Sequence, residues 1–226
     1  MLAMLDRVSI VEMLAEYYRK RAKEYDALYA SAAWQGDLPV LQDWLVQEVR
    51  GKSVLEVAAG TGYWTAVTAP VASTVVATDI NLEMLAIAST KHLGAHVVLL
   101  QSDCWQLPHF STEFEVGMAH LWWSHVRKED RTRFLSHFAS RLNPSASILM
   151  IDENHVRDVG MPIGRRDTTG NTYQTRWLGN GDRFEIVKNY PDRAELEECI
   201  GQVCEDVDVL QLTHFWAIRA TVRMRE

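Results

Sequence analysis

The chain has 226 residues, of which 47% are hydrophobic, and this is enough to build one substantial core in a single domain. Its formal net charge of -7 at pH 7 repels a nucleic-acid backbone, so nucleic acid is not expected as a partner. The three cysteines form no Cys-x-x-Cys pair, and charged residues interrupt every apolar stretch before it reaches membrane-spanning length. These features predict a cytoplasmic protein that has no membrane partner.

The first 50 residues are expected to be helical. Between residues 10 and 28, apolar and aromatic residues recur at the spacing of one helix face, with Tyr17 and Tyr18 among them. A second helix is expected to begin after Asp37. We therefore assign residues 1–50 to a helical N-terminal segment.

Residues 51–153 have the texture of an α/β sheet. Short, largely apolar runs rich in Val, Leu and Ile predict buried parallel strands at 53–59, 73–79, 95–102, 115–119 and 147–152. Helical stretches are expected between them at 65–71, 81–92 and 128–142. Alternation of this kind predicts a doubly wound sheet, in which ligands bind at the carboxyl ends of the strands.

The last third of the chain departs from this alternation. Within residues 154–190, two strand-like runs flank the turn sequence Gly179-Asn180-Gly181, which predicts an inserted β-hairpin. Within residues 191–226 we expect a helix that begins near Asp192, followed by an antiparallel strand pair at 207–213 and 215–222. The complete prediction is a mostly parallel seven-stranded sheet with an antiparallel C-terminal pair.

A turn of small residues follows the first predicted strand, within residues 54–62 (VLEVAAGTG). Small residues let a ligand approach the backbone closely, and the helix that follows offers unpaired N–H groups. A dinucleotide-binding turn requires Gly-x-Gly-x-x-Gly, and neither the frame from Ala58 nor the frame from Gly60 provides it.

These residues resemble motif I of class I S-adenosylmethionine-dependent methyltransferases of the small-molecule type, which have a Rossmann-like fold. Glu56 matches the acidic residue of the motif, Gly60 and Gly62 match two of its glycines, and Ala58 stands where the first glycine is usual. The resemblance implies S-adenosylmethionine as cofactor and S-adenosylhomocysteine as product. It also implies that Asp79 accepts the ribose hydroxyls and that Asp103 meets the adenine amino group.

The N-terminal helices resemble the lid that closes over the methionine end of the cofactor in small-molecule methyltransferases. The resemblance implies further cofactor contacts from Tyr17, Tyr18, Arg21, Trp64, Ile80, Cys104 and His120. For any one of the lid tyrosines, packing in the core is an equally good interpretation.

His125 is the candidate general base, because a histidine after the fourth strand is placed to deprotonate a hydroxyl or an amine. It begins the next helical region, and a capping or packing role is an alternative. Neighbouring Trp122 and Trp123 suit a pocket wall as well as a core.

Arg176 and Lys188 lie on opposite arms of the expected hairpin, where both cations could face one anion. Together with residues 55–65, the Trp-x-x-His-Val run ending at Val126 and residues 176–188, they resemble the phosphonate O-methyltransferase of dehydrophos-type antibiotic biosynthesis. The resemblance implies that this arginine and lysine bind the acidic group of the acceptor. Tyr25, Tyr29 and Trp123 complete the expected substrate site.

Other functions remain open at this point. The acceptor is a phosphonate or a carboxylate, or alternatively a neutral hydroxyl, amine or thiol with His125 as base. A protein-arginine enzyme would need paired carboxylates in its substrate loop, and a DNA-adenine enzyme would need an Asn/Asp-Pro-Pro-Tyr/Phe run. No metal is expected, because Asp152, Asn154 and His155 cluster after one strand and make no convincing ligand set. A non-catalytic cofactor-binding protein, monomeric or homodimeric, is the remaining alternative.

Overall fold

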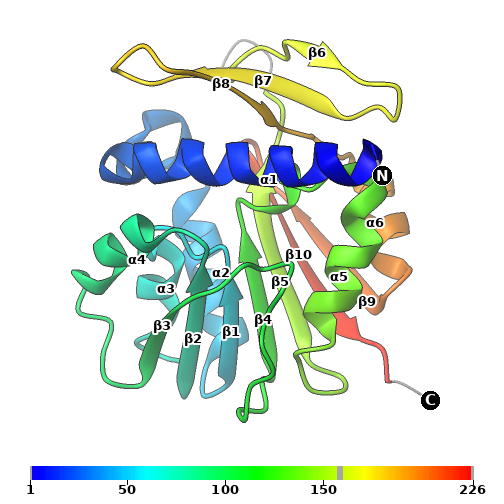
Figure 1. The fold of residues 1–226 in the computed structure, drawn as a ribbon. Coiled ribbons are helices and arrows are strands. Elements are labelled where there is room, and N and C mark those ends of the chain that lie inside the picture. The colour runs from blue at the N-terminus through cyan, green and yellow to red at the C-terminus, as the bar shows by residue number, and fades with distance from the viewer. Residues whose placement is uncertain (1, 157–159, 225–226) are drawn as a thin grey trace.

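A seven-stranded sheet forms the centre of the protein in the computed structural model, which describes residues 2–156 and 160–224 (Figure 1). Its order is β3-β2-β1-β4-β5-β10-β9, and β10 runs antiparallel to both β5 and β9, whereas the other neighbours are parallel. The strands are β1 (Ser53–Val57), β2 (Thr74–Asp79), β3 (Val97–Gln101), β4 (Val116–His120), β5 (Ser147–Glu153), β9 (Cys204–Gln211) and β10 (Phe215–Val222). The predicted fold class is confirmed.

Helices cover both faces of this sheet, and β1 and β4 are accordingly buried along their whole length. The helices are α2 (Leu38–Val49), α3 (Tyr63–Thr68), α4 (Leu82–Ser89), α5 (Arg131–Ala139) and α6 (Arg193–Gly201). On one face Leu41 of α2 shares a core with Trp64 of α3, and on the other Phe134 of α5 shares a core with Leu196 of α6. None of the helices in the described ranges is long and apolar enough to span a bilayer.

The N-terminal helix α1 (Leu2–Arg21) crosses the carboxyl ends of the strands, between the main sheet and a smaller sheet (Figure 1). Two 3₁₀ helices, η1 (Ala22–Ala30) and η2 (Ala32–Trp34), connect it to α2. Leu14 and Tyr17 are buried against Ile186 of the smaller sheet. The chain is therefore helical where the sequence predicts it, but it changes to the tighter 3₁₀ form at Ala22.

The smaller sheet contains the predicted hairpin as β7 (Thr172–Trp177) and β8 (Arg183–Val187), together with a third strand, β6 (Arg165–Arg166). The sequence analysis missed β6, because a pair of arginines has no strand pattern. The guanidinium of Arg165 lies 3.5 Å from the ring centroid of Tyr173 on β7 and pairs with Glu185 on β8. These contacts across the sheet hold the short strand in place.

Two predicted boundaries are wrong. Strand β9 begins at Cys204, earlier than the predicted residue 207, because the acidic residues Glu205 and Asp206 obscure the strand pattern on this exposed edge. The predicted helix 128–142 is divided into a 3₁₀ turn, η4 (Lys128–Asp130), and the shorter α5.

The turn after β1 uses left-handed backbone at three positions, with φ of 51° at Ala58, 56° at Gly60 and 73° at Gly62. Ala58 therefore occupies a conformation that favours glycine, which explains why glycine is usual there. At Gly62 the turn also packs closely against α4, since a Cβ added there would lie 2.8 Å from the Cβ of Ala88. This close contact joins α3 to α4 beneath the turn.

Gly62→Ala is expected to lower the free energy of unfolding by about 2–3 kcal/mol, because backbone strain and a steric clash act together. Gly51→Ala is the matched control, since Gly51 has a φ of 72° but its added Cβ would meet nothing within 4 Å. The control is expected to cost only about 1 kcal/mol, from strain alone. Urea unfolding of both variants measures the difference, and equal losses would contradict the packing argument.

Candidate active site

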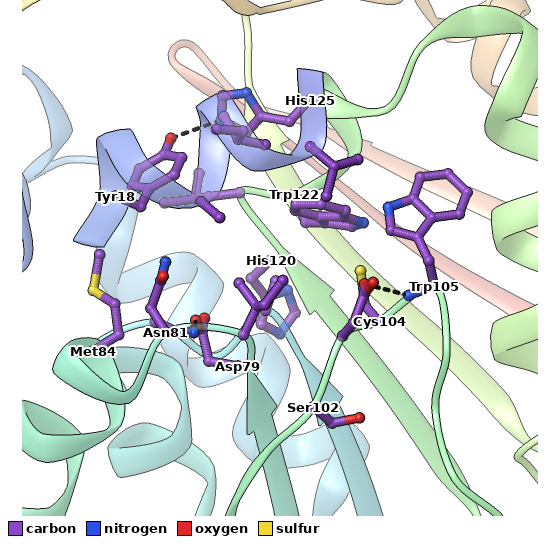
Figure 2. Close-up of a pocket in the computed structure, with 18 of the residues that line it drawn as sticks. Tyr18, Asp79, Asn81, Met84, Ser102, Cys104, Trp105, His120, Trp122 and His125 are labelled. Atoms are coloured by element: carbon purple, nitrogen blue, oxygen red, sulfur yellow. Dashed lines mark hydrogen bonds between the residues drawn. The ribbon is translucent and has the colours of Figure 1, made fainter. Parts of the chain in front are cut away.

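A cleft lies at the carboxyl ends of the parallel strands, with α1 as its roof (Figure 2). The loops that follow β1, β2, β3 and β4 form its floor, which is where the fold predicts a ligand site. The predicted site residues that line it are Tyr18, Tyr25, Ala58, Gly60, Asp79, Ile80, Asp103, Cys104, His120 and His125. The cleft thus brings together residues that are far apart in the sequence.

Asp79 ends β2 and joins the turns on either side of it. Its carboxylate accepts hydrogen bonds from the backbone N–H of Gly60 and from that of Asn81, each at 2.8 Å. Burial raises the pKa of Asp79, and the two N–H donors act in the opposite direction. An acceptor held rigidly in this way suits a ligand that presents hydroxyl donors.

The loop after β3 contributes the next acidic residue, Asp103. Its Oδ1 accepts a hydrogen bond from the backbone N–H of Trp105 at 2.9 Å, which fixes the loop against the cleft. Burial raises the pKa of the neighbouring Cys104 thiol well above its usual range. Cys104 is therefore a neutral, apolar part of the wall and not a nucleophile.

His120, the last residue of β4, has two ring nitrogens without a hydrogen-bond partner among the described residues. Burial lowers the pKa of His120 to about 3, so the ring is neutral and offers one donor and one acceptor. Buried polar atoms are nearly always paired. The unpaired nitrogens of His120 therefore indicate a polar ligand at this point of the cleft.

His125 and Tyr18 meet at the roof of the cleft, where Nε2 of His125 lies 2.7 Å from the Tyr18 hydroxyl (Figure 2). The other ring nitrogen, Nδ1, lies 2.7 Å from the carbonyl oxygen of Val187. Because a carbonyl only accepts, Nδ1 carries the proton and Nε2 accepts from Tyr18. Burial and the nearby Lys188 lower the pKa of His125 to about 3, so it is neutral in this arrangement.

Comparison with known proteins agrees with this geometry. Residues 54–145 match the family model of a methyltransferase domain. The fold is similar to that of the DhpI–SAH complex, with a TM-score of 0.80 and 27% identity over 96% of this chain and 98% of that chain. The chain is an S-adenosylmethionine-dependent methyltransferase.

Other comparisons support the same assignment of the fold. The methyltransferase is similar to the DhpI–SAM–HEP complex, with a TM-score of 0.78 and 26% identity over 93% of this chain and 97% of that chain. An S-adenosylmethionine-dependent methyltransferase from Clostridium acetobutylicum ATCC 824 shares its fold, with a TM-score of 0.62 and 16% identity over 92% of this chain and 99% of that chain. No curated protein matches the chain.

Several predicted cofactor residues lie beside the cleft of the methyltransferase and not on its surface. Glu56 is 1% exposed and accepts a hydrogen bond from Thr65 Oγ1 at 2.6 Å, and burial raises its pKa to about 8. Gly62 packs against α4, and the ring of Trp64 lies 5.5 Å from that of His120. These residues support the turn and His120 from behind.

Of the residues predicted in the N-terminal lid, some line the cleft and others lie outside it. Tyr18 and Tyr25 line the cleft, whereas Tyr17 is buried against the smaller sheet and its hydroxyl accepts from Arg21 Nη1 at 2.9 Å. Tyr29 stacks on Tyr63 with 3.5 Å between ring centroids, outside the cleft lining. Trp123 is fully buried in the core.

The two hairpin cations do not face each other. Arg176 is paired in register with Phe184, and the backbone of Lys188 bonds to that of Thr172 at the other end of the hairpin. The ammonium of Lys188 lies 3.3 Å from Asp152 Oδ1 and 2.5 Å from Glu153 Oε2. Neither side chain lines the cleft, although both lower the pKa of His125 through their charge.

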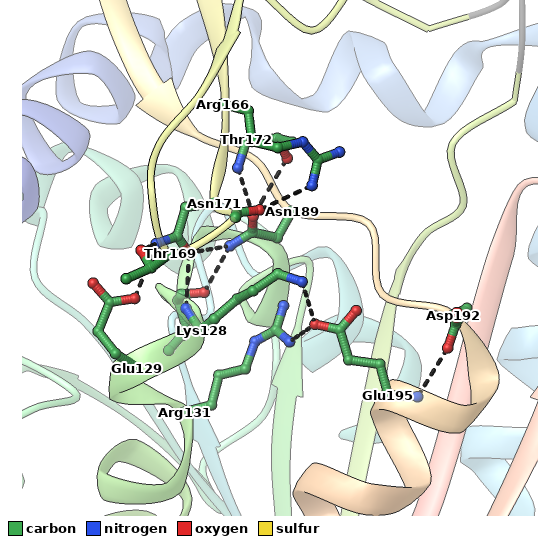
Figure 3. Close-up of polar contacts among 12 residues, drawn as sticks. Lys128, Glu129, Arg131, Arg166, Thr169, Asn171, Thr172, Asn189, Asp192 and Glu195 are labelled. Carbon is green, nitrogen blue, oxygen red and sulfur yellow. Dashed lines mark hydrogen bonds and ion pairs between the residues drawn. The ribbon is translucent and has the colours of Figure 1, made fainter.

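A network of asparagines fixes the smaller sheet above the active site (Figure 3). Asn171 accepts from the backbone N–H of Lys128 at 2.8 Å and donates to Glu129 Oε2 at 2.9 Å. Asn189 donates to the Asn171 side chain at 3.1 Å, and its backbone N–H bonds to Ser124 O at 2.7 Å. The carbonyl of Val187 that orients His125 is therefore held by the same network.

The cleft lining also includes residues that the sequence analysis did not select, among them Asn81, Met84 and Trp105. Asn81 and Trp105 each follow within two residues of a predicted strand-end carboxylate, and this proximity was the available indication. No cluster of three or more His, Cys, Asp or Glu side chains suited to a metal ion occurs in the described part of the chain.

Proposed function

We propose that the methyltransferase transfers the methyl group of S-adenosylmethionine to an oxygen of a small anionic molecule, a phosphonate or a carboxylate. The observation that carries this proposal is the guanidinium of Arg176, which acts on the roof of the cleft and pairs with no carboxylate among the described residues. Burial raises the pKa of Tyr18 to about 12, and the cations that oppose this shift are Lys188, Arg176 and Arg21. Because Asp152 and Glu153 neutralise Lys188, the two arginines supply the positive field that an anion beside Tyr18 would meet.

Arg176 is the hairpin cation that remains free to bind an anion, although its side chain lies beside the cleft lining. Its Nη2 donates to the neutral side chain of Gln174 at 2.7 Å, and its buried Nε has no hydrogen-bond partner. Among the described residues no carboxylate pairs with it, in contrast to Lys188. A partly buried guanidinium that lacks a counterion favours binding of an oxyanion.

Similarity to known proteins favours the same class of acceptor. The hairpin residues resemble a phosphonate O-methyltransferase, and the DhpI–SAM–HEP complex is 26% identical to this chain. Because close relatives can use different acceptors, we include carboxylates in the proposal.

The cleft fits the cofactor. A Cβ added at Gly60 would meet nothing within 4 Å, so the turn leaves open space beside its backbone, and the unpaired nitrogens of His120 face the same cleft. We assign the ribose hydroxyls to Asp79 and the adenine amino group to Asp103. The bound sulfonium supplies an activated methyl group, and holding the acceptor in line with it can contribute about 7–11 kcal/mol.

An anionic oxygen is already a nucleophile, so this reaction needs no general base. The pKa of Tyr18 is raised to about 12, so its hydroxyl stays protonated and donates a hydrogen bond to His125 Nε2. When an oxygen of the methyl acceptor takes the place of His125 Nε2, the Tyr18 hydroxyl donates its hydrogen bond to that oxygen instead. Tyr18 is therefore the proposed orienting group for the acceptor.

A neutral acceptor is the second candidate, and one observation favours it. The tautomer of His125 leaves an unprotonated Nε2 at the roof of the cleft, held in place by the bond from Nδ1 to Val187. A substrate hydroxyl, amine or thiol in the position of the Tyr18 hydroxyl would have a base within hydrogen-bond reach.

Release of S-adenosylhomocysteine across phosphonates, carboxylates, alcohols, amines and thiols tests the proposal directly. For the anionic acceptor that turns over, Arg176→Gln is expected to raise KM about 10- to 100-fold, through loss of a charged hydrogen bond, with cofactor affinity unchanged. Arg183→Gln is the matched control, because Arg183 lies exposed on the neighbouring strand β8.

The two candidates predict different outcomes. Turnover of neutral acceptors only, lost in His125→Ala and unaffected in Arg176→Gln, would establish the general-base reaction in place of the anionic one. Turnover of anionic acceptors with an Arg176→Gln effect no larger than that of Arg183→Gln would show that Arg176 does not hold the anion.

A further inference from the structure

A small side pocket opens from the cleft where Trp105 and Trp122 face each other. The lining of this pocket includes Ile10, Val11 and Leu14 of α1 on one side, and the ion pair of Arg127 with Asp130 on another. It shares both tryptophans, His125, Val11 and Leu14 with the main cleft, but it includes neither Asp79 nor Asp103 nor the glycine turn. The pocket is therefore separate from the residues assigned to the cofactor.

The indole nitrogens of Trp105 and Trp122 are buried, and neither has a hydrogen-bond partner among the described residues. Figure 2 shows the two nitrogens pointing toward one another across the space between the rings. An indole N–H only donates, so the two groups cannot satisfy each other. One acceptor atom placed between them would pair with both.

The surrounding side chains hold the rings in this orientation. Both rings contact Phe134, with centroid distances of 5.4 Å for Trp105 and 6.1 Å for Trp122. The guanidinium of Arg133 lies 4.8 Å from the centroid of the Trp105 ring, and Asp103 fixes the Trp105 backbone. The two donors are therefore set in place before a ligand binds, which is typical of a binding site.

We infer that Trp105 and Trp122 together bind an oxygen at the end of the acceptor remote from its methylated group. The apolar residues of α1 would cover the short carbon chain between the two ends. This inference rests on the proposed function and specifies its substrate class: a small molecule with an anionic group at one end and a second oxygen acceptor, such as a carboxylate, at the other. His125, which borders both cavities, marks the point where the two parts of the acceptor meet.

Two probes that differ only at the remote end test the inference. In 3-phosphonopropanoate the end opposite the phosphonate is a carboxylate, and in propylphosphonate it is a methyl group. Calorimetry on the enzyme saturated with S-adenosylhomocysteine is expected to show tighter binding of 3-phosphonopropanoate by about 10-fold or more, because of its extra hydrogen bonds. Trp105→Phe and Trp122→Phe, which keep the rings and remove the N–H groups, are each expected to lose most of this preference.

Trp216→Phe is the matched control. Its indole nitrogen is also buried and unpaired, but the residue is part of the core and lines neither cavity. This variant is expected to keep the full preference of the wild type. In ¹H–¹⁵N spectra, the indole signals of Trp105 and Trp122 are expected to move on addition of 3-phosphonopropanoate, while that of Trp216 stays in place.

Each other outcome overturns the inference in a recognisable way. If both tryptophan variants bind S-adenosylhomocysteine about 10-fold more weakly and keep the probe preference, the N–H groups hold the cofactor. If propylphosphonate binds as well as 3-phosphonopropanoate, the remote oxygen has no site, although the proposed function survives. If neither probe binds, the anionic acceptor fails together with the inference.

Discussion

Lys188→Ala is expected to lower the free energy of unfolding by about 3–5 kcal/mol, because it leaves the buried Asp152 and the partly buried Glu153 without a counterion. Lys188 is 2% exposed, and its ammonium bonds to Asp152 and to Ser124 Oγ and pairs with Glu153. Asp152 is fully buried. Urea unfolding of the variant measures the loss.

The pKa of Lys188 shows that its attraction to the neighbouring carboxylates outweighs the cost of burying its charge. Burial acts to lower it, but Asp152 and Glu153 together hold it above its ordinary value. The ammonium is therefore charged in the folded protein, and its removal would leave two uncompensated negative charges. The resemblance to phosphonate methyltransferases gives the matching lysine a substrate role, whereas the contacts of Lys188 give it a structural one.

Lys20→Ala provides the control for the loss of a lysine. Lys20 pairs with Asp182 at 2.6 Å, but their side chains are 34% and 38% exposed, so water screens the pair and its loss is expected to change stability much less than the loss of Lys188. Adding Asp152→Asn to Lys188→Ala is expected to recover part of the stability, since one of the stranded charges is removed. A Lys188→Ala enzyme of normal stability with a raised KM would instead support the role that the resemblance implies.

The difference over Lys188 illustrates what the sequence does and does not contain. Apolar runs and the turn at residues 179–181 are local features, and they were sufficient to predict the seven strands and the hairpin. Strand register and the approach of Lys188 to Asp152 depend on long-range packing, which leaves no local pattern. For this reason the sequence predicted a shared anion for the two hairpin cations, but it gave no sign that Lys188 pairs with Asp152 and Glu153.

In the candidate site, too, local sequence features were predictable and contacts set by long-range packing were not. Asp79 and Asp103 were predictable as cleft residues, because carboxylates at the ends of parallel strands must gather at one edge of the sheet. The orientation of Glu56 was not predictable, since its side chain turns to Thr65, below the turn. The unpaired nitrogens of Trp105 and Trp122 appear only when the rings are placed in space.

Asp79→Ala is expected to weaken S-adenosylhomocysteine binding by at least about 100-fold, because the charged hydrogen bonds that we assign to the ribose would contribute roughly 1.5–3 kcal/mol each. The variant also releases the backbone N–H groups of Gly60 and Asn81, which Asp79 holds at 2.8 Å. Both effects act on the same ligand site. Calorimetric titration of the purified variant with S-adenosylhomocysteine gives the change in Kd.

Glu56→Gln is the matched control, because Glu56 is an equally buried carboxyl of the same turn that does not line the cleft. Burial raises its pKa to about 8, so the side chain is mostly neutral at pH 7 and glutamine closely imitates it. We expect its cofactor affinity to stay within about 3-fold of the wild type, less than the effect of one lost hydrogen bond. Should Glu56→Gln lose the cofactor while Asp79→Ala retains it, the ribose would have to lie against β1, and the assignment of the two carboxyls would be reversed.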